Sequence, residues 1–373
     1  MIFNKKLWVI KNIEEVCESI FAGGDVPKSR YSKTKTEIFN IPIYSNGEKD
    51  EGLYGFTDIK KVAKPSLTIS ARGTIGYSVL REKDFYPIVR LVVLIPRTDI
   101  VNLYFLKLSI GNIDFISSGT SIPQLTVPMV KRYSILLPPL EEQKQIVELF
   151  QSIQTAIEQV EEQGKRLKEL RRSLCNGLLL KEPVFGNLLN KDNCSTVNFS
   201  YFTESIEMHD KNKKDVHQVV GLENIEPEDF TIKTWGNIED GTTFTKRFQK
   251  GDVLFGKRRA YLKKVAVADF DGICSSDILV LRAKQDKMIP ELLPFYVSAE
   301  PFIQYAVSTS AGSLSPRTKW KDLGELEVSL PKIELQKKIL EVLQNVETTR
   351  NQLVLQKSSL KKLKQQLLNE IFG

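Results

Sequence analysis

Two stretches, far apart along the chain, carry apolar residues spaced three and four positions apart. The first begins at Leu137 with LPPLEEQKQIVELF, and the second begins at Leu330 with LPKIELQKKILEVL. This spacing places the apolar residues on one face of a long helix and is typical of a coiled-coil seam. The predicted seam residues are Ile146, Phe150, Ile153, Ile157, Val160, Leu167 and Leu174 in the first stretch and Ile339, Leu343, Val346, Leu353, Leu360 and Leu367 in the second.

The two helical stretches are copies of each other. At a shift of 193 positions they share 16 identical residues in 43 aligned positions, without a gap. The same shift carries Gly119 onto Gly312 and Pro123 onto Pro316, so the repeat begins before the helices. These matches indicate an internal duplication. Both seams are interrupted at equivalent positions, by Gly164 and Lys357 and by Arg171 and Lys364, and Arg350 stands at the repeat position of Ile157.

The length of the helices predicts that they pack on each other. A helix of about 40 residues runs roughly 60 Å, which is too long to be covered by a globular domain of about 140 residues. We therefore expect four parts: a first globular domain at 1–138, a long helix at 139–182, a second globular domain at 183–331 and a second long helix at 332–373.

The segments before the helices predict mixed globular domains built on one plan. PSLTISARGTIGYSVL and YPIVRLVVLIP in the first half indicate strands around a glycine-rich turn, and GDVLFGKRRAYLKKVAVADFDGICSSDILVLRA indicates the same plan in the second. Placing Lys64 against Lys250 puts Arg72 on Arg258 and Thr74 on Ala260. Similar scaffolds with different residues at the turn predict two related ligands that are read separately.

The turn in the second half is strongly basic. Between Lys246 and Lys264 the chain has eight basic residues and one acid, with Phe248, Phe255 and Tyr261 among them. A surface of cations and aromatic rings suits a polyanion such as nucleic acid, although a lysine-rich strand edge facing solvent is the alternative. The G-x-x-x-x-G-K spacing here is not a phosphate-binding loop, because Arg258 replaces the Ser or Thr that holds Mg²⁺.

Composition narrows the class of protein further. The 373-residue chain has a net charge of +7, four scattered cysteines and two histidines. These counts disfavour disulfide frameworks, zinc clusters and histidine-based catalysis. The apolar runs are too short to cross a bilayer and we find no signal peptide, so we expect a cytoplasmic protein without a membrane partner. No adenine-methyltransferase motif and no ATP-binding loop is present in the sequence.

The paired tails, together with GLENI, SPRTKWKDLGELEVSLP, GGDVPKSRY and SSGTSIPQL, resemble the specificity subunit of type I restriction–modification systems. The resemblance covers essentially the entire chain. It implies an α+β fold with a pseudo-two-fold internal repeat. Two tandem mixed α/β target-recognition domains are separated by two long helices, which form an antiparallel coiled coil. Each domain then reads one half of a split double-stranded DNA sequence.

The resemblance also implies the partners. The subunit has no catalytic activity and holds no cofactor or metal. Two modification subunits would methylate adenine with S-adenosylmethionine, and restriction subunits would use ATP and Mg²⁺. We expect the modification subunits on outer helix faces that include Glu141, Glu142, Lys165 and Arg166. Two alternatives remain: the specificity subunit of a system with a fused nuclease–methyltransferase, and a coiled-coil scaffold without a DNA role.

The basic turns and the resemblance together give candidate DNA contacts in both halves. In the first half these are Lys28, Arg30, Lys33, Lys35, Arg72, Thr74 and Tyr77. In the second half they are Lys246, Arg247, Lys257, Arg258, Arg259, Tyr261, Lys263, Lys264 and Arg317.

Overall fold

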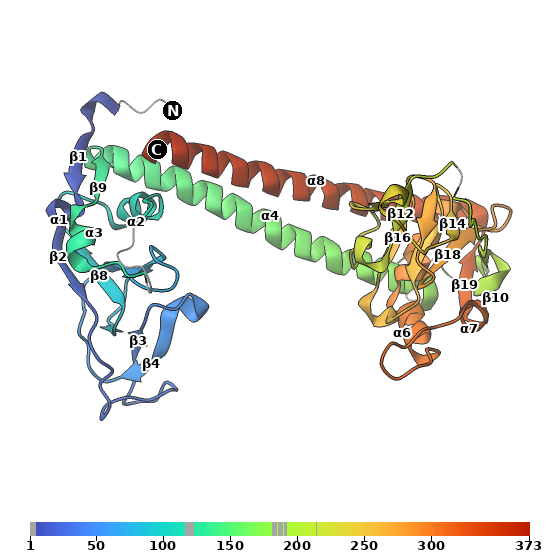
Figure 1. The fold of residues 1–373 in the computed structure, drawn as a ribbon, viewed down its shortest axis with the longest axis horizontal. Coiled ribbons are helices and arrows are strands. Elements are labelled where there is room, and N and C mark those ends of the chain that lie inside the picture. The colour runs from blue at the N-terminus through green and yellow to red at the C-terminus, as the bar shows by residue number, and fades with distance from the viewer. Residues whose placement is uncertain (1–4, 116–122, 181–184, 186–188, 190–191, 214) are drawn as a thin grey trace. The chain divides into compact units, whose positions relative to one another are not determined.

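The computed structural model describes residues 5–115, 123–180, 185, 189, 192–213 and 215–373. The chain divides into two compact units (Figure 1). Unit 1 comprises Met1–Val160 and Gln356–Gly373, and unit 2 comprises Glu161–Leu355. The long helices are α4, Leu140–Leu180, and α8, Ile333–Phe372, close to the predicted ranges. Each helix contributes residues to both units. The predicted boundary at 182–183 and the repeat residue Gly119 lie outside the described residues.

Unit 1 combines short helices with small sheets, whose strand pairs are antiparallel except for β3 with β7. Its helices besides α4 and α8 are α1 Ile13–Val16, α2 Leu103–Gly111 and α3 Val127–Arg132, with 3₁₀ helices at Lys5–Leu7 and Lys49–Gly52. Its strands are β1 Val9–Asn12, β2 Cys17–Ala22, β3 Ile41–Tyr44, β4 Leu53–Thr57, β5 Ser66–Ser70, β6 Ser78–Arg81, β7 Tyr86–Pro87, β8 Leu91–Pro96 and β9 Ser134–Leu137. One sheet has the order β2-β8-β5-β6, a second has the order β4-β3-β7, and β1 pairs with β9.

Unit 2 has a related set of elements. Its helices are α5 Leu293–Ser298, α6 Glu300–Ser308 and α7 Trp320–Gly324, with 3₁₀ helices at Phe199–Tyr201, Leu222–Asn224, Ile238–Asp240, Ala260–Leu262 and Pro290–Leu292. Its strands are β10 Cys194–Asn198, β11 Thr203–Ser205, β12 Gln218–Val220, β13 Gly236–Asn237, β14 Lys246–Phe248, β15 Val253–Gly256, β16 Val265–Val267, β17 Gly272–Cys274, β18 Ile278–Ala283 and β19 Glu327–Pro331. The sheets have the orders β11-β18-β15-β16 and β13-β12-β17-β14, and β10 pairs with β19.

The strand order repeats from unit to unit. The sheet β2-β8-β5-β6 corresponds to β11-β18-β15-β16, and all of its pairs are antiparallel in both copies. The registers also agree, since Leu67 pairs with Leu94 and Leu80 where Val253 pairs with Leu281 and Val267. In the other sheet, β3 and β12 each lie between one antiparallel and one parallel neighbour. The duplication read from the helices therefore extends through both globular parts.

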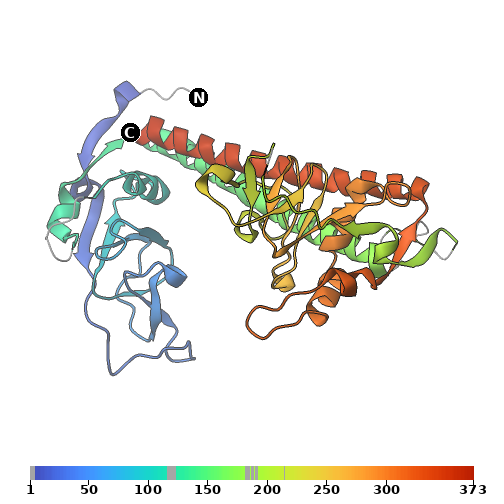
Figure 2. The same cartoon turned by 45° about the vertical axis from the view of Figure 1, so that its right-hand side comes forward.

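The helices complete the core of each unit. The α4 and α8 segments lie side by side (Figures 1 and 2). In unit 1, Ile146 and Phe150 share a core with Ile371, and in unit 2, Leu174 shares a core with Leu343. The predicted seam residues lie on the packed sides of the helices. Those buried are Ile146, Phe150, Ile153, Ile157, Val160, Leu174, Ile339, Leu343 and Val346, and those half-buried are Leu167, Leu353, Leu360 and Leu367.

Polar side chains pair across the helices where the apolar seam is interrupted. In unit 2, Arg171 of α4 forms an ion pair with Glu347 of α8, with only 7% and 16% of their side chains exposed. In unit 1, Lys364 of α8 donates to Oε1 of Gln154 of α4 at 2.9 Å. The shift of 193 relates Arg171 to Lys364 and Gln154 to Glu347. The duplication has therefore kept one polar cross-link in each unit, at equivalent positions.

Candidate nucleic-acid interface

The basic turn of unit 2 is held by the hairpin of β15 and β16. The connecting segment contains the 3₁₀ helix Ala260–Leu262, flanked by Arg259 at φ 53° and Lys263 at φ 54°. Left-handed backbone is uncommon for residues other than glycine and is sustained by surrounding contacts. Here the Lys263 N–H donates to the Ala260 carbonyl at 2.9 Å and the Arg259 N–H donates to the Pro316 carbonyl at 2.8 Å. The turn is therefore fixed in shape.

A segment distant in sequence lies against this turn. Arg258 and Arg317 form an isolated antiparallel bridge, and the Thr318 N–H donates to the Lys257 carbonyl at 3.1 Å. A third segment joins them, because the Lys257 N–H donates to the Asp277 carbonyl at 2.9 Å. Three predicted contacts, Lys257, Arg258 and Arg317, are thus brought together on one small platform.

The Asp277 carboxylate holds the two arginines of this platform. Arg317 Nε donates to Oδ1 at 2.6 Å, and Arg258 Nη1 donates to Oδ2 at 3.2 Å. Burial alone raises the pKa of the Asp277 carboxyl, but the hydrogen bonds from Arg317 and Arg258 outweigh it, and the pKa is lowered. Asp277 is 16% exposed, whereas Arg258 and Arg317 are 39% and 48% exposed. An ionised carboxylate thus orients two guanidinium groups that still face solvent.

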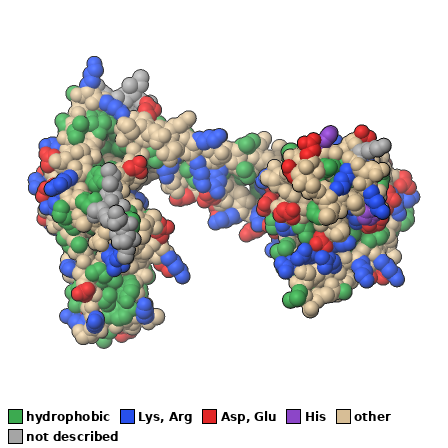
Figure 3. Space-filling model, viewed as in Figure 1, with side chains coloured by type: hydrophobic (Ala, Val, Ile, Leu, Met, Phe, Trp, Pro, Cys, Tyr) green, Lys and Arg blue, Asp and Glu red, His purple; other side chains and the backbone are tan. Residues whose placement is uncertain are grey.

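The other predicted contact residues of the turn differ in their exposure and in whether other groups of the protein bind their side chains. Tyr261 is 52% exposed and Arg259 is exposed. Lys263 Nζ contacts Glu300 at 2.6 Å, and Lys264 Nζ donates to the Leu222 carbonyl at 2.6 Å. Burial, with the nearby charge of Lys246, lowers the pKa of Lys257. On the face of unit 2 that Figure 3 draws, Asp and Glu side chains lie among Lys and Arg side chains.

Lys246 does not lie on the surface, and the expectation that it contacts DNA is wrong for that reason. Its side chain is buried, and Nζ is bound by Glu207 and by the Ile278 carbonyl, at 3.0 and 3.4 Å. In β14, alternate residues face opposite sides, so Lys246 points inward with Phe248. Arg247 points the other way, but it is half-buried and forms an ion pair with Asp210 at 3.1 Å.

Unit 1 repeats the backbone platform with other side chains. The Ala71 N–H donates to the Arg90 carbonyl at 2.9 Å, and the Leu125 N–H donates to the Ala71 carbonyl at 2.9 Å. These are the counterparts of the bonds that Lys257 makes with Asp277 and Thr318. Because Ser70 pairs with Leu91 as Gly256 pairs with Ile278, Arg90 takes the place of Asp277. The acid that orients the arginines in unit 2 is thus an exposed arginine in unit 1.

The predicted turn residues of unit 1 lie beside this platform. Arg72 and Tyr77 are half-buried, and Thr74 is exposed. Gly73 and Gly76, at φ 77° and 88°, allow the chain to reverse between β5 and β6. The backbone at Arg72 is held because its carbonyl accepts from Asn46 Nδ2 at 2.7 Å.

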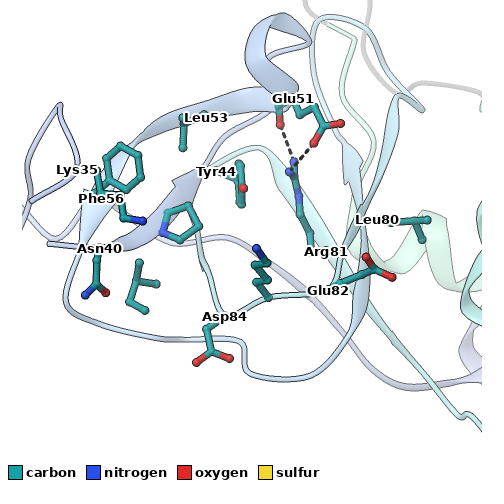
Figure 4. A pocket seen from close by; sticks show the side chains of 13 residues that line it. Lys35, Asn40, Tyr44, Glu51, Leu53, Phe56, Leu80, Arg81, Glu82 and Asp84 are labelled. Carbon is teal, nitrogen blue, oxygen red and sulfur yellow. Dashed lines mark hydrogen bonds and ion pairs between the residues drawn. The ribbon is translucent and has the colours of Figure 1, made fainter. Parts of the chain in front are cut away.

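The other predicted cations of unit 1 come before β3 in the chain. Lys28 is exposed, and Arg30 binds Asp58 through two nitrogens, at 2.8 and 2.6 Å. Lys33 Nζ lies 4.6 Å from the centre of the Tyr54 ring. Lys35 lines an open hollow of about 710 Å³ (Figure 4). All four residues lie on one connection, residues 23–40, between β2 and β3.

Buried Arg81 supports the side of that hollow. Its guanidinium lies 3.5 Å from the centre of the Tyr44 ring and donates to the Glu51 carbonyl at 2.6 Å (Figure 4). Burial lowers the pKa of Arg81, and the contacts with Tyr44 and Glu51 oppose this shift. With 3% of its side chain exposed, Arg81 serves the structure and is not a surface contact.

Sequence reasoning missed Asp277 and Arg90. Both precede an apolar strand, and neither belongs to the basic run between Lys246 and Lys264. A signal was present: once Leu91 is aligned with Ile278, Arg90 falls on Asp277. The strand register is needed for this alignment, because the chain between β15 and β18 is one residue longer than the chain between β5 and β8.

In the described part of the chain, no group of three or more His, Cys, Asp or Glu residues could hold a metal ion. Among the same residues, no helix is both long and apolar enough to cross a membrane.

Comparison with known proteins gives a consistent picture. The model of the family described as "Type I restriction modification DNA specificity domain" matches residues 5–169 and 186–364. A putative type I specificity subunit of Mycoplasma pneumoniae is 33% identical over 153 residues, which cover 40% of this chain and 45% of that protein. The type I restriction enzyme EcoDI specificity subunit of Escherichia coli is 28% identical over 268 residues, covering 62% of this chain and 59% of that protein. This chain therefore spans less than two thirds of these relatives.

Solved structures share the fold. A type I restriction–modification S subunit from M. genitalium has a TM-score of 0.59 at 14% identity, covering 100% of this chain and 98% of that chain. The HsdS subunit from Thermoanaerobacter tengcongensis has a TM-score of 0.52 at 18% identity, with coverage of 98% and 96%.

Proposed function

Because this chain belongs to the type I restriction–modification DNA specificity family, we propose that it supplies the DNA sequence specificity of such a complex. In this proposal each globular domain reads one half of a bipartite double-stranded target. One observation carries it: the two units have the same hydrogen-bonded platform with different side chains, because Asp277 holds Arg258 and Arg317 in unit 2, whereas Arg90 takes the place of Asp277 in unit 1. One scaffold with two chemical surfaces suits two different half-sites.

The platform of unit 2 has the chemistry of a base reader. Arginine pairs with the O6 and N7 acceptors of guanine in the major groove through two parallel hydrogen bonds. Such readout needs guanidinium groups whose orientation is set before binding. Asp277 supplies that orientation for Arg258 and Arg317, and the exposed Arg259 beside them is suited to phosphate. We therefore assign base contacts to Arg258 and Arg317 and phosphate contacts to Arg259 and its neighbours.

The helices have two roles in the proposal. They set the number of unspecified bases between the half-sites, and they carry two modification subunits. Of the outer residues expected to meet those subunits, Glu141 is 75% exposed and Arg166 is 76% exposed, and Lys165 is also exposed. Glu142 is partly committed, because Trp8 Nε1 donates to its carboxylate at 2.7 Å. We therefore give Lys165 and Arg166 more weight than Glu142.

We further propose that the chain is non-catalytic and acts in the cytoplasm. Modification subunits would bring S-adenosylmethionine, and restriction subunits would bring ATP and Mg²⁺. A fused nuclease–methyltransferase partner is the alternative arrangement. In either arrangement this chain would supply the DNA sequence specificity. The genes that neighbour its own gene would distinguish the two.

Methylome sequencing tests the proposal directly. Cells that express this chain with its modification partner should acquire adenine methylation in a two-part motif with a fixed spacer. Cells that express the partner alone are the control and should lack that motif. A purified chain that does not bind mixed double-stranded DNA in a fluorescence-anisotropy titration would favour the scaffold alternative.

A further inference from the structure

Unit 1 has a hollow of about 370 Å³ between its globular part and the helices, with no role in the proposed DNA reading. It is lined by Leu80, Tyr104, Lys107, Leu108, Val147, Phe150, Gln151, Gln154 and Lys364. Val147 and Phe150 are buried in the core of the unit, and Leu80, Tyr104 and Leu108 pack against that core. Its walls are thus largely apolar, and Lys107 and Lys364 bring positive charge.

The duplication identifies the same place in unit 2. The shift of 193 carries Gln154 onto Glu347 and Lys364 onto Arg171. By strand register Leu80 corresponds to Val267. Leu108 corresponds to Phe295 because each lies six residues after a residue whose backbone N–H donates to an equivalent glutamine. Asn102 donates to Gln143 in unit 1, and Ile289 donates to Gln336 in unit 2.

In unit 2 this place is filled by Phe230. Its ring lies 5.2 Å from the Phe295 ring in an edge-to-face arrangement, and the Arg171 guanidinium lies 4.2 Å from its centre. The Phe230 carbonyl accepts from the Val267 N–H at 2.8 Å. The aromatic ring therefore contacts the counterparts of Leu108 and Lys364, and its backbone binds the counterpart of Leu80.

Acidic residues just before Phe230 engage the cations of the helices. The Glu228 carbonyl accepts from Arg171 Nη1 at 3.2 Å, and the Glu228 carboxylate forms an ion pair with Lys168. Asp229 lies 3.9 Å from Arg350 Nη2. The acids and the ring thus act as one anchor, with the ring in the hollow and the charges at its rim.

In unit 1 the connection that corresponds to this anchor segment is shorter. Phe230 belongs to the long connection 221–235 between β12 and β13, whereas the equivalent connection between β3 and β4 is the shorter 45–52. The cations have nevertheless been kept, since Lys361 stands at the repeat position of Lys168 and Lys364 at that of Arg171. Among the described residues of unit 1, the hollow and its lysines are present, and no counterpart of Phe230 fills the space.

We propose that the unit 1 hollow is a docking site for a partner protein segment in which acidic residues precede an aromatic residue. The pattern is that of Glu228-Asp229-Phe230. The aromatic side chain would fill the space among Leu80, Leu108 and Phe150, and the acidic groups would meet Lys361 and Lys364. Burial of one aromatic anchor with flanking charges is a common way for short segments to bind. This site goes beyond the proposed DNA reading and does not depend on it.

A peptide copied from the chain itself tests the proposal. The probe is a fluorescein-labelled peptide, EPEDFTIK, with the sequence of residues 226–233, titrated against the full chain by fluorescence anisotropy. Binding should be saturable and should weaken as salt rises. A peptide with Ala in place of Phe should bind at least about tenfold more weakly, because a buried phenylalanine is a large apolar contribution.

Variants locate the binding site. Leu108→Trp should fill the hollow and abolish binding, and Lys364→Gln should weaken it several-fold. The matched control is Lys362→Gln, which removes an exposed lysine of α8 outside the hollow and should leave binding unchanged. Thermal unfolding checks that each variant folds. If Leu108→Trp does not fold, the comparison of peptide binding between Lys364→Gln and the control Lys362→Gln tests the site.

Three outcomes would overturn the proposal. One is the absence of saturable binding at millimolar peptide, which would also be seen if another part of this chain occupied the hollow. Another is equal binding of the peptide that lacks phenylalanine. The third is binding lost in Arg171→Gln but kept in Leu108→Trp, which would place the peptide in unit 2.

Discussion

Gln143 and Gln336 make the same three hydrogen bonds in the two units. Gln143 Oε1 accepts from the Asn102 N–H at 2.8 Å, and Nε2 donates to the carbonyls of Ile100 and Pro138 at 3.0 and 2.8 Å. Gln336 does the same with Ile289, Lys287 and Pro331, at 2.9, 3.1 and 2.9 Å. Both side chains are fully buried. Each ties the start of a long helix to the globular part of its own unit.

Replacing either glutamine by leucine should therefore destabilise the protein to a similar extent. Each change leaves a half-buried N–H, a half-buried carbonyl and a buried proline carbonyl without their partner, and one unsatisfied buried group costs about 1–3 kcal/mol. Since the two side chains share no partner, we expect the double variant to show nearly the sum of the single effects. Chemical denaturation would measure the free energy of unfolding. A loss confined to one of the two variants would mean that the equivalent bonds are not equally important.

Neutralising Arg258 and Arg259 together should weaken DNA binding and flatten its salt dependence. Of the two residues, Arg259 is the one assigned to phosphate, and each phosphate contact adds about 0.9 to the slope of log K against log salt, so the slope should fall by about one. Anisotropy titrations at several salt concentrations measure it. Arg166→Gln, which removes a cation from the helix surface, is the control. An unchanged slope would mean that Arg259 makes no phosphate contact.

Asp277→Asn should lower stability at neutral pH but not in acid. The pKa of Asp277 is lowered from 3.8 in the folded chain, so its ion pairs stabilise the fold above that value and are lost as the pH falls through the lower folded pKa. The expected loss at pH 7 is about 1 kcal/mol, since the arginine partners are partly exposed. Denaturation at pH 7 and near pH 2 checks this. A difference of equal size at both pH values would mean that the effect is not ionic.

The same substitution should also change DNA recognition. Without the carboxylate, Arg258 and Arg317 lose their fixed orientation, while one negative charge is removed from a surface that faces phosphate. Binding to unrelated DNA should therefore strengthen, and discrimination between correct and altered half-sites should fall. Competition titrations with single-base variants of the motif would measure both. Unaltered discrimination would show that Asp277 does not orient a base contact.

Arg72→Ala should damage recognition of one half-site and leave the other intact. Loss of one base contact costs about 1–3 kcal/mol, and the other platform is built from other residues. Methylome sequencing of cells that carry the variant would show relaxed sequence in a single half of the motif. Equal loss in both halves would indicate that Arg72 is structural.

Lengthening both helices should change the spacer and preserve the half-sites. Seven residues added to α4 near Gly164, with seven added to α8 at the opposing position, keep the seam in phase and add about 10.5 Å, close to three base pairs. The methylated motif should gain unspecified bases with its specified bases unchanged. A variant that kept the original spacer would show that the helices do not set it.

The sequence by itself determined the long helices, the duplication and the strand–turn–strand plan. These depend on local periodicity and on similarity between two parts of one chain, so 139–182 and 332–373 could be predicted to within a few residues. Gln143 and Gln336 were visible as aligned residues, but their hydrogen bonds to distant backbone were not, because those partners come from other segments.

Only the tertiary structure decided which charges face solvent and which are held. In the sequence Lys246 and Arg258 belong to the same basic run, yet a strand turns Lys246 into the core beside Glu207 and leaves Arg258 exposed. Asp277 joined the site because β18 pairs with β15, a contact between residues far apart in the chain. Phe230 fills its hollow through a longer connection that no local pattern marks. The burial of side chains, the pairing of strands and the filling of the hollow by Phe230 all depend on contacts between distant segments. Local periodicity and charge counts do not reveal those contacts.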